Sequence, residues 1–310
     1  MNFLKLIRYQ NLLMLAFMQL IFRYGFLKLQ NVPLALTEWQ YVLLVLSTVL
    51  LAAAGYVIND IFDQDTDNDN KPKDVIIGKK ITEAKAYNIY AALNVAGVGI
   101  GFYLSNVISK PGFAAIFILI AATLYIYATS LKQMLILGNI IVALLLSFSV
   151  IIIGIFDLYP VVDQVNQPIM ANLFSILLDF ALFAFMINFI REIVKDLEDI
   201  EGDSNQGMKT LPIVLGMHNT SKLASILGLI PMAFLLVYIN NYFVANDLIV
   251  TTIYAFAFVV APLLYFSVKV WPAKTKKEFR KLSLLLKWIL FFGIISIAII
   301  TLNIKYNASK

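Results

Sequence analysis

The chain has 310 residues, of which 61% are hydrophobic and 14% are charged, and its mean hydropathy is +0.83. This composition lies far outside that of soluble domains and indicates an integral membrane protein. Cysteine is absent and His218 is the only histidine, which excludes disulfide frameworks, thiolate chemistry and histidine-rich metal sites; the net charge is +5.

Hydrophobic runs long enough to cross a bilayer recur along the whole chain. They predict an all-α integral membrane protein in one domain, residues 1–310, because no linker long enough to separate a second domain lies between them. The nine predicted transmembrane helices are 9–29, 39–62, 84–107, 112–131, 135–156, 171–195, 221–243, 248–270 and 284–304. The first run resembles a signal peptide, but without a convincing small-residue cleavage site we interpret it as a retained span.

The second predicted helix ends in the segment from Asn59 to Pro72, which reads N-D-I-F-D-Q-D-T-D-N-D-N-K-P. On a helix, Asp60, Asp63 and Asp67 fall within an arc of about 60°, and the other two aspartates of this segment point the opposite way. Three like charges on one face repel one another unless a cation lies between them. Ligands that offer only oxygen suit Mg²⁺ better than Zn²⁺, so this helix end is a candidate magnesium site.

Two other interpretations of this segment are open. A calcium loop is suggested by the alternating aspartates of residues 63–69 and by Asp74 at the twelfth position, but its sixth position needs glycine and here is Asn68. Pro72 also fits poorly inside such a loop. A solvated acidic loop is the other alternative, although Asp60 lies so close to the apolar run that desolvating it without a partner would be costly.

A second acidic motif has the same spacing as the first. Asp196, Asp199 and Asp203 again follow the end of a hydrophobic run, and Asn188 and Glu192 extend their stripe backwards along the helix. Two acidic helix ends that can each hold Mg²⁺ suggest a clamp around a pyrophosphate, in which the metal neutralises the leaving group.

Basic residues lie close to both motifs. Lys71 follows the first motif, Lys209 follows the second, and Lys132 lies just past the fourth predicted helix. These positions make all three candidates for phosphate contacts, with a plain topology signal as the alternative.

The distribution of Lys and Arg sets the expected orientation. With nine helices, 19 of the 24 basic residues fall on one side, in segments 5–8, 71–85, 132, 191–222 and 269–287. We therefore expect a multi-pass protein of the cytoplasmic membrane with its N-terminus and both aspartate motifs on the cytoplasmic face and its C-terminus outside. The basic segment 269–287 is expected to meet anionic lipid, not nucleic acid.

Taken together, these residues resemble the UbiA superfamily of membrane prenyltransferases. The family pattern N-D-x-x-D-x-x-x-D matches residues 59–67, and its second pattern, D-x-x-D-x-x-x-D, matches residues 196–203. The segment Y-x-x-S-L-K at 127–132, the G-N that follows it at 138–139, and the opening R-x-x-N at 8–11 are also similar to the family.

The resemblance implies helices around a lipid-open central cavity, Mg²⁺ as cofactor, and transfer of a prenyl group from polyprenyl pyrophosphate to a lipophilic acceptor. The expected metal ligands are Asn59, Asp60, Asp63, Asp67, Asp196, Asp199 and Asp203, of which Asp60, Asp63, Asp196 and Asp199 are expected to be catalytic. The expected substrate-binding residues are Arg8, Asn11, Lys71, Tyr127, Lys132, Asn188, Glu192 and Lys209.

Within the family, the sequence R-E-I-V-K-D-L-E-D-I-E-G-D at 191–203 and K-T-L-P at 209–212 are most similar to the branch that makes ether lipids from geranylgeranylglyceryl phosphate. Menaquinone-type and 4-hydroxybenzoate-type enzymes of quinone biosynthesis are the alternative, and N-K-P-K-D at 70–74 departs from the arginine that many members carry beside this proline. An ion-coupled transporter is the alternative from another class, but it does not explain two matching acidic motifs at one face. The sequence implies no obligate protein partner and no general base.

Overall fold

A computed structural model describes residues 2–70, 72 and 75–308, and apart from one isolated bridge between Ile77 and Ile81 their regular structure is helical. Nine helical stretches of these residues are long and apolar enough to cross a membrane, which confirms the nine predicted helices. The stretches are Tyr9–Gln30, Glu38–Phe62, Glu83–Val107, Pro111–Thr129, Leu137–Val161, Gln167–Glu198, Met217–Asn246, Ile249–Val270 and Lys276–Asn307.

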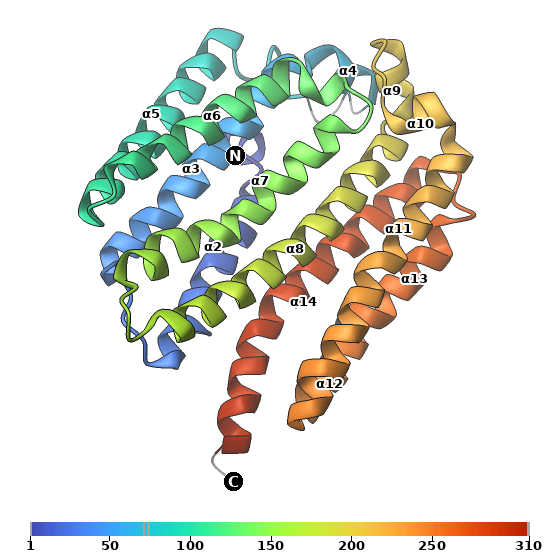
Figure 1. Cartoon of the computed structure of the whole chain (residues 1–310). Coiled ribbons are helices and arrows are strands. Elements are labelled where there is room, and N and C mark those ends of the chain that lie inside the picture. Colours follow the sequence, from blue (N-terminus) through green and yellow to red (C-terminus); the bar gives the residue numbers. More distant parts are fainter. Residues whose placement is uncertain (1, 71, 73–74, 309–310) are drawn as a thin grey trace.

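The labels in Figure 1 follow the order of the chain. The α-helices are α1 (Asn2–Leu6), α2 (Tyr9–Tyr24), α3 (Glu38–Phe62), α4 (Gln64–Asn70), α5 (Glu83–Val107), α6 (Ala114–Thr129), α7 (Leu137–Ile153), α8 (Gln167–Glu198), α9 (Ile200–Asn205), α10 (Leu211–Leu215), α11 (Met217–Tyr238), α12 (Ile249–Ala255), α13 (Ala261–Val270) and α14 (Lys276–Ala308). The π-helical turns are η4 (Gly154–Leu158), η6 (Ile239–Phe243) and η8 (Phe256–Val260), and the 3₁₀ turns are η1 (Leu27–Gln30), η2 (Pro111–Phe113), η3 (Leu131–Gln133), η5 (Tyr159–Val161) and η7 (Val244–Asn246).

Polar residues fix where several helices begin. Thr37 and Gln40 form a capping box at the start of α3, and the Thr82 hydroxyl accepts a hydrogen bond from the Lys85 backbone N–H at the start of α5. The spans themselves are apolar on most sides, as expected of helices that contact lipid as well as one another.

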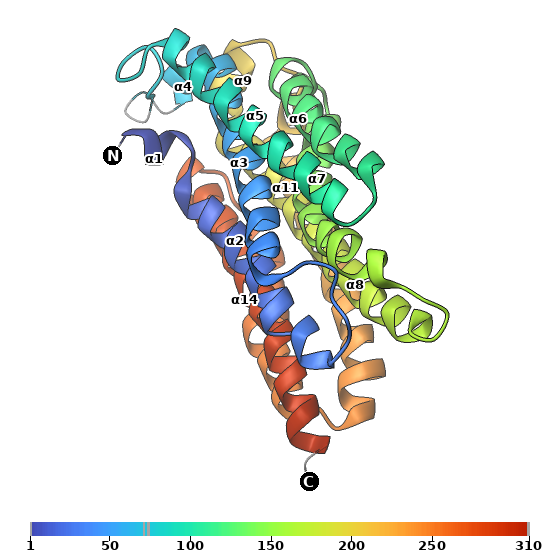
Figure 2. The same cartoon turned by 90° about the vertical axis from the view of Figure 1, so that its left-hand side faces the viewer.

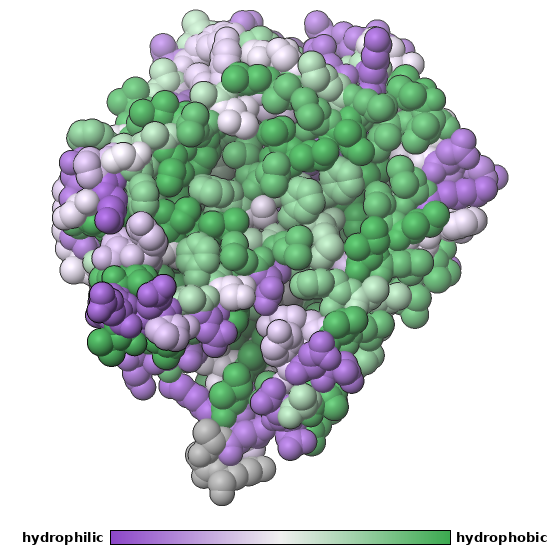
Figure 3. Space-filling model, viewed as in Figure 1, coloured by the Kyte–Doolittle hydropathy of each residue, from purple (hydrophilic) through white to green (hydrophobic). Residues whose placement is uncertain are grey.

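The long helices lie side by side, and the two ends of the bundle differ in character (Figures 1 and 2). Helices α4 and α9 lie at the same end as the N-terminus, and the C-terminus lies at the opposite end. Hydrophobic residues cover the middle of the face in Figure 3, whereas hydrophilic residues gather towards the ends of the helices. This distribution is the one expected of a protein that spans a bilayer.

Helix α8 connects the two largest hydrophobic cores. Its first half, with Leu173 and Leu177, packs into a core shared with α2, α3 and α7, and its second half, with Ile190 and Val194, packs into a core shared with α11, α13 and α14. The second half of α8, which carries the acidic end, is therefore held by the second group of helices.

A buried ion pair anchors the end of the bundle away from α4. Arg23 Nη1 lies 2.5 Å from Asp157 Oδ2, and both side chains are almost fully buried. The second Arg23 nitrogen donates to the Leu36 carbonyl at 2.6 Å, and the Leu36 N–H donates to Asp157 at 3.0 Å. These bonds tie α2 and the loop before α3 to the π-helical turn η4.

The largest boundary difference concerns α14. The sequence predicts a helix from residue 284 after a basic loop, whereas α14 begins at Lys276. The backbone N–H of Thr275 donates to Glu278 Oε2 at 2.9 Å, and the N–H of Glu278 donates to Thr275 Oγ1 at 3.3 Å. This reciprocal cap starts the helix about two turns early, so that Lys287 lies eleven residues into it.

Candidate functional site

The first acidic motif spans the junction between α3 and α4. Helix α3 ends at Phe62, and Asp63 is its C-cap, so the motif does not lie on one uninterrupted helix. The chain nevertheless keeps its direction, because the Asp67 N–H donates to the Asp63 carbonyl at 2.7 Å. Asp60, Asp63 and Asp67 are therefore all partly buried. Asp65 and Asp69 are exposed, as the helical arc predicts.

Two cations from distant parts of the chain contact this motif. Arg8 Nη2 lies 2.8 Å from Asp60 Oδ1, and Lys132 Nζ donates to Asp63 Oδ1. The other Asp63 oxygen accepts a hydrogen bond of 2.5 Å from Asn59 Nδ2. The loop before α2 and the turn after α6 thus meet at the end of α3.

The backbone of Arg8 is in the left-handed region, with φ 49° and ψ 52°. A non-glycine residue in this region is strained, and such strain is found most often where a side chain must be aimed at a site. Burial lowers the pKa of Arg8, but the charges of Asp60 and Tyr56 outweigh it and raise the pKa above its ordinary value. Arg8 therefore stays a cation beside Asp60.

The second acidic motif lies at the end of α8 and in α9. Asn139, on α7, donates from Nδ2 to Asp196 Oδ2 at 2.8 Å. Lys276, the first residue of α14, lies with its Nζ 3.8 Å from Asp199 Oδ1. Asp203 lies on α9 and is 8% exposed. This motif is therefore more deeply enclosed than the first.

The two motifs are joined directly through α4 and α9, which lie next to each other (Figure 1). Asn70 donates to the Asp199 carbonyl and accepts from the Gly202 N–H, both at 3.1 Å. Asn205 donates to Asp69 at 3.2 Å. A Cβ atom on Gly202 would lie 2.3 Å from Asn70 Nδ2, so glycine is what allows α4 and α9 to approach this closely.

The donor atoms of the two motifs fit a hard divalent cation. Their side chains offer carboxylate and amide oxygens, and Asn59 Oδ1 is buried without a hydrogen-bond partner among the described residues. Among the residues that the structure describes, no three His, Asp or Glu side chains converge as a ready-made metal site. Asp60, Asp63 and Asp196 instead pair with a guanidinium, an ammonium and an amide.

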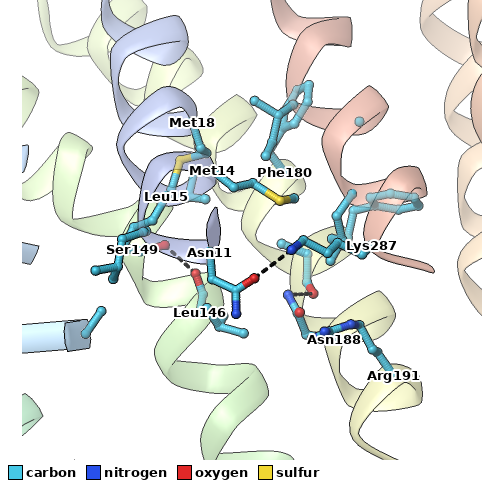
Figure 4. Close-up of a pocket in the computed structure, with 18 of the residues that line it drawn as sticks. Asn11, Met14, Leu15, Met18, Leu146, Ser149, Phe180, Asn188, Arg191 and Lys287 are labelled. Carbon is cyan, nitrogen blue, oxygen red and sulfur yellow. Dashed lines mark hydrogen bonds between the residues drawn. The ribbon is translucent and has the colours of Figure 1, made fainter. Parts of the chain in front are cut away.

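A cavity of about 130 Å³ opens between α2, α3, α7, α8 and α14, close to the motifs (Figure 4). Tyr56, one turn before Asp60, lines it from α3. Asn11, Asn188, Arg191 and Lys287 line one part of it. Methionine, leucine and phenylalanine side chains make up most of the rest, among them Met14, Met18 and Phe180. The cavity is thus apolar in its body and basic at one end.

The predicted substrate-binding residues take different positions. Asn11 and Asn188 line the cavity, and Tyr127 lies on α6, two residues before its end. Glu192 is buried and accepts a 2.6 Å hydrogen bond from Lys195 Nζ.

Of the two remaining predicted lysines, Lys209 does not line the cavity. Lys209 is exposed, and its backbone N–H donates to the Gln133 carbonyl at 3.1 Å, which places it beside the loop that carries Lys132. Lys71 lies outside the described residues.

Sequence reasoning missed three residues of this region, Arg191, Lys276 and Lys287, and quoted Asn139 only as part of a motif. Arg191 carried a usable signal, since it lies three residues after Asn188 on the same helical face. Lys287 interrupts the apolar run L-S-L-L-L-K-W-I-L, and a charge inside a span suggests a functional site. Both had been counted only as topology signals.

Comparison with known proteins identifies the family. Residues 24–298 match the model of the UbiA prenyltransferase family. The chain belongs to that family. As a UbiA member, it is a multi-pass membrane prenyltransferase, and the transporter alternative is excluded.

Relatives and solved structures agree with this assignment. Digeranylgeranylglyceryl phosphate synthase of Methanobrevibacter smithii is 30% identical over 266 residues, which span 86% of this chain and 88% of the relative. Matches to several further proteins of that name span 57–64% of those chains.

Two solved UbiA structures share the fold. A UbiA homolog from Aeropyrum pernix K1 is similar with a TM-score of 0.67 and 16% identity, over 93% of this chain and 97% of that one. A UbiA homolog from Archaeoglobus fulgidus, bound to GPP and Mg²⁺, has a TM-score of 0.57 and 15% identity, over 96% of this chain and 99% of that one.

Proposed function

We propose that this UbiA enzyme transfers a geranylgeranyl group from its pyrophosphate to geranylgeranylglyceryl phosphate, a step of ether-lipid synthesis. The observation that carries the proposal is a pair of joined acidic motifs beside an apolar cavity with a basic end. The relative in Methanobrevibacter smithii, named for this product, supports the choice of acceptor.

The acidic residues are assigned to the donor pyrophosphate. Asn59, Asp60, Asp63 and Asp67 on one side, and Asp196, Asp199 and Asp203 on the other, would hold Mg²⁺; the Archaeoglobus fulgidus homolog, bound to GPP and Mg²⁺, supports this cofactor. When bound, the metal neutralises charge that develops on the pyrophosphate as it leaves.

The basic residues act beside the carboxylates. Arg8 and Lys132, which pair with Asp60 and Asp63, are close enough to contact phosphate oxygens of a bound donor. The bond between the prenyl carbon and pyrophosphate breaks, and its electron pair leaves with the pyrophosphate. The acceptor hydroxyl oxygen forms the new C–O bond, and its proton passes to the departing pyrophosphate. The apolar cavity excludes water, which would otherwise capture the allylic cation.

The proposal includes an orientation and a domain assignment. The whole chain, 1–310, forms one UbiA-type domain with its cavity open to lipid, and both acidic motifs face the cytoplasm, as the excess of Lys and Arg favours. The opposite placement of the two chain ends supports an odd number of spans, with the C-terminus outside.

A competition assay tests the acceptor. Purified enzyme receives geranylgeranyl pyrophosphate and Mg²⁺ with geranylgeranylglyceryl phosphate, 4-hydroxybenzoate and dihydroxynaphthoate together. We expect the glyceryl phosphate to be the prenylated product. Exclusive prenylation of an aromatic acid would instead support the quinone-biosynthesis alternative, because a carboxylate would also suit the basic end of the cavity.

A further inference from the structure

Two basic side chains lie deep between the helices, in the wall of the cavity. Lys287 is eleven residues into α14, about 16 Å of helix rise from its first residue. Arg191 is seven residues before the end of α8, about 10 Å along the helix. Figure 4 shows both side chains beside Asn11 and Asn188, at the polar part of the cavity. Cations at such positions are costly unless they meet a partner.

The partners within the protein do not balance these charges. Lys287 Nζ donates to Asn11 Oδ1 at 2.7 Å, and this amide carries no charge. Arg191 Nη1 lies 3.6 Å from Glu192 Oε1, but the same oxygen already accepts from Lys195 at 2.6 Å.

The imbalance between donors and acceptors is clearest at one nitrogen atom of Arg191. Arg191 Nε is buried and has no hydrogen-bond partner among the described residues. A buried donor without a partner has lost its hydrogen bonds to water and gained none in the protein, which is costly. Glu192 therefore meets two cations, Arg191 and Lys195, while Lys287 meets only a neutral amide, so these contacts leave positive charge and a donor unbalanced in the wall of the cavity.

We propose that Arg191 and Lys287 form a subsite for the phosphate headgroup of the lipid acceptor, with its hydrocarbon chain in the apolar part of the cavity. This assignment rests on the proposed function and names the residues that recognise its acceptor. Arginine and lysine are the side chains that bind phosphate best, and Asn11 and Asn188 add polar groups at the same place.

The position of the subsite favours the acceptor over the donor. Asp196 lies five residues beyond Arg191, about 8 Å along α8. The donor pyrophosphate belongs with the carboxylates and their metal, and a second anion at Arg191 would lie one to two turns deeper. The acceptor hydroxyl, which neighbours the headgroup, would then face the prenyl carbon of the donor.

A binding experiment without metal and without donor tests the acceptor subsite by itself. Geranylgeranylglyceryl phosphate and its dephosphorylated alcohol are titrated into the purified full-length protein in EDTA, without donor. We expect the wild type to bind the phosphate at least about tenfold more tightly than the alcohol. Lys287→Met and Arg191→Gln should lose this preference, Lys287→Arg should keep part of it, and Lys281→Met, an exposed control on the same helix, should keep all of it. Equal binding of phosphate and alcohol by the wild type would overturn the proposal.

Steady-state kinetics with Mg²⁺ separates the two substrates. In Lys287→Met and Arg191→Gln, the KM for geranylgeranylglyceryl phosphate should rise about tenfold or more, and the KM for geranylgeranyl pyrophosphate should stay within about twofold. A rise confined to the donor, or equal rises for both substrates, would assign these cations to the pyrophosphate and refute the acceptor subsite. Thermal melting identifies any variant that fails to fold. The comparison of phosphate and alcohol binding by the wild type tests the subsite even if a variant fails to fold.

The outcomes also separate this inference from the proposed function. Wild-type transfer to geranylgeranylglyceryl phosphate, with folded variants that keep both KM values, refutes the subsite and leaves the function standing. If the wild type transfers the prenyl group to an aromatic acid and to no other acceptor, the proposed function and the lipid subsite are both refuted.

Discussion

The acidic side chains of this enzyme pair with groups that come from distant parts of the chain. Arg8 reaches Asp60 across 52 residues, Lys132 reaches Asp63 across 69, and Asn139 reaches Asp196 across 57. A carboxylate near the end of a membrane helix is costly without a partner, so these contacts stabilise the fold in the absence of metal. They also place cations where the charge of a pyrophosphate would arrive.

At this scale the sequence predicts the acids better than their partners. The spacing of Asp60, Asp63 and Asp67 is local, and the helical period alone indicates a common face. Lys132 was a candidate by its position, but its pairing with Asp63 depends on how α6 packs against α3. Asn139 was part of the G-N that supported the family resemblance, but its pairing with Asp196 gave no local signal, because a neutral amide near the start of an apolar helix is unremarkable until its neighbour is known.

We predict that the two acidic motifs share the catalytic function. Asp60→Asn, Asp63→Asn, Asp196→Asn and Asp199→Asn should each lower turnover by about 100-fold or more, because each removes a charge expected to hold the metal. The matched control is Asp65→Asn, an exposed aspartate of the same segment, which should change turnover little. Turnover in a radiolabelled prenyl transfer assay, with titrated Mg²⁺, measures the effect. An equal loss in the control would contradict the one-face arrangement.

At the scale of elements, the contact between α4 and α9 decides how the motifs are held together. Neither helix exceeds seven residues, and so neither is stable alone. Asn70 bonds to the backbone of α9 at two places, on either side of its first turn. The close approach at Gly202 makes both bonds possible.

We predict that Gly202→Ala separates the two motifs. The new methyl group would lie 2.3 Å from Asn70 Nδ2, and relief of this clash should cost about 1–3 kcal/mol and lower turnover. Gly99→Ala is the control, because a Cβ at Gly99 in α5 would meet nothing within 4 Å. Alanine in a helix interior is about 1 kcal/mol more favourable than glycine, so Gly99→Ala should melt at the same temperature or higher. Thermal melting in detergent and turnover of both variants check this, and a Gly202→Ala enzyme with wild-type turnover would show that the contact is dispensable.

The existence of the helices was predictable from the sequence, and their ends less so. Hydropathy finds nine spans because the bilayer imposes a length on each of them. It misses the start of α14, where the cap formed by Thr275 and Glu278 extends the helix into a basic segment. It also treats Arg23 as an outer surface charge, whereas the π-helical turn η4 brings Asp157 to it in the core. Such pairings depend on tertiary packing, which no local pattern encodes.

At the scale of the whole molecule, the two ends of the bundle are chemically distinct, and this difference predicts the topology. Ser204, on α9, and Val165, in the loop before α8, are exposed at opposite ends of the spans. Because the chain contains no cysteine, Ser204→Cys and Val165→Cys each create a single labelling site. We expect a membrane-impermeant maleimide added to intact cells to modify the cysteine at 165 only, and the cysteine at 204 after permeabilisation. Modification of the residue 204 cysteine from outside would reverse the orientation.

A second cavity follows the first along the bundle. It has a volume of about 60 Å³ and shares Phe180, Phe183 and Gly293 with the first cavity, from which these residues separate it. A Cβ on Gly293 would lie 3.6 Å from the Phe183 ring, so the ring faces α14 where that helix has no side chain. Asp179, on α8, lines this second cavity.

We predict that Phe183 limits the length of the acceptor chain. With its headgroup at Arg191 and Lys287, the chain would run past Met14 and Met18 towards Phe183. Phe183→Ala should join the two cavities and shift the preference towards longer chains, whereas Gly293→Leu should fill the passage and favour shorter ones. The measurement is kcat/KM for geranyl-, farnesyl- and geranylgeranyl-glyceryl phosphate, with Leu182→Ala, a change to an exposed neighbour on α8, as the control. An unchanged order of preference in both cavity variants would mean that the chain leaves the bundle between the helices before it reaches Phe183.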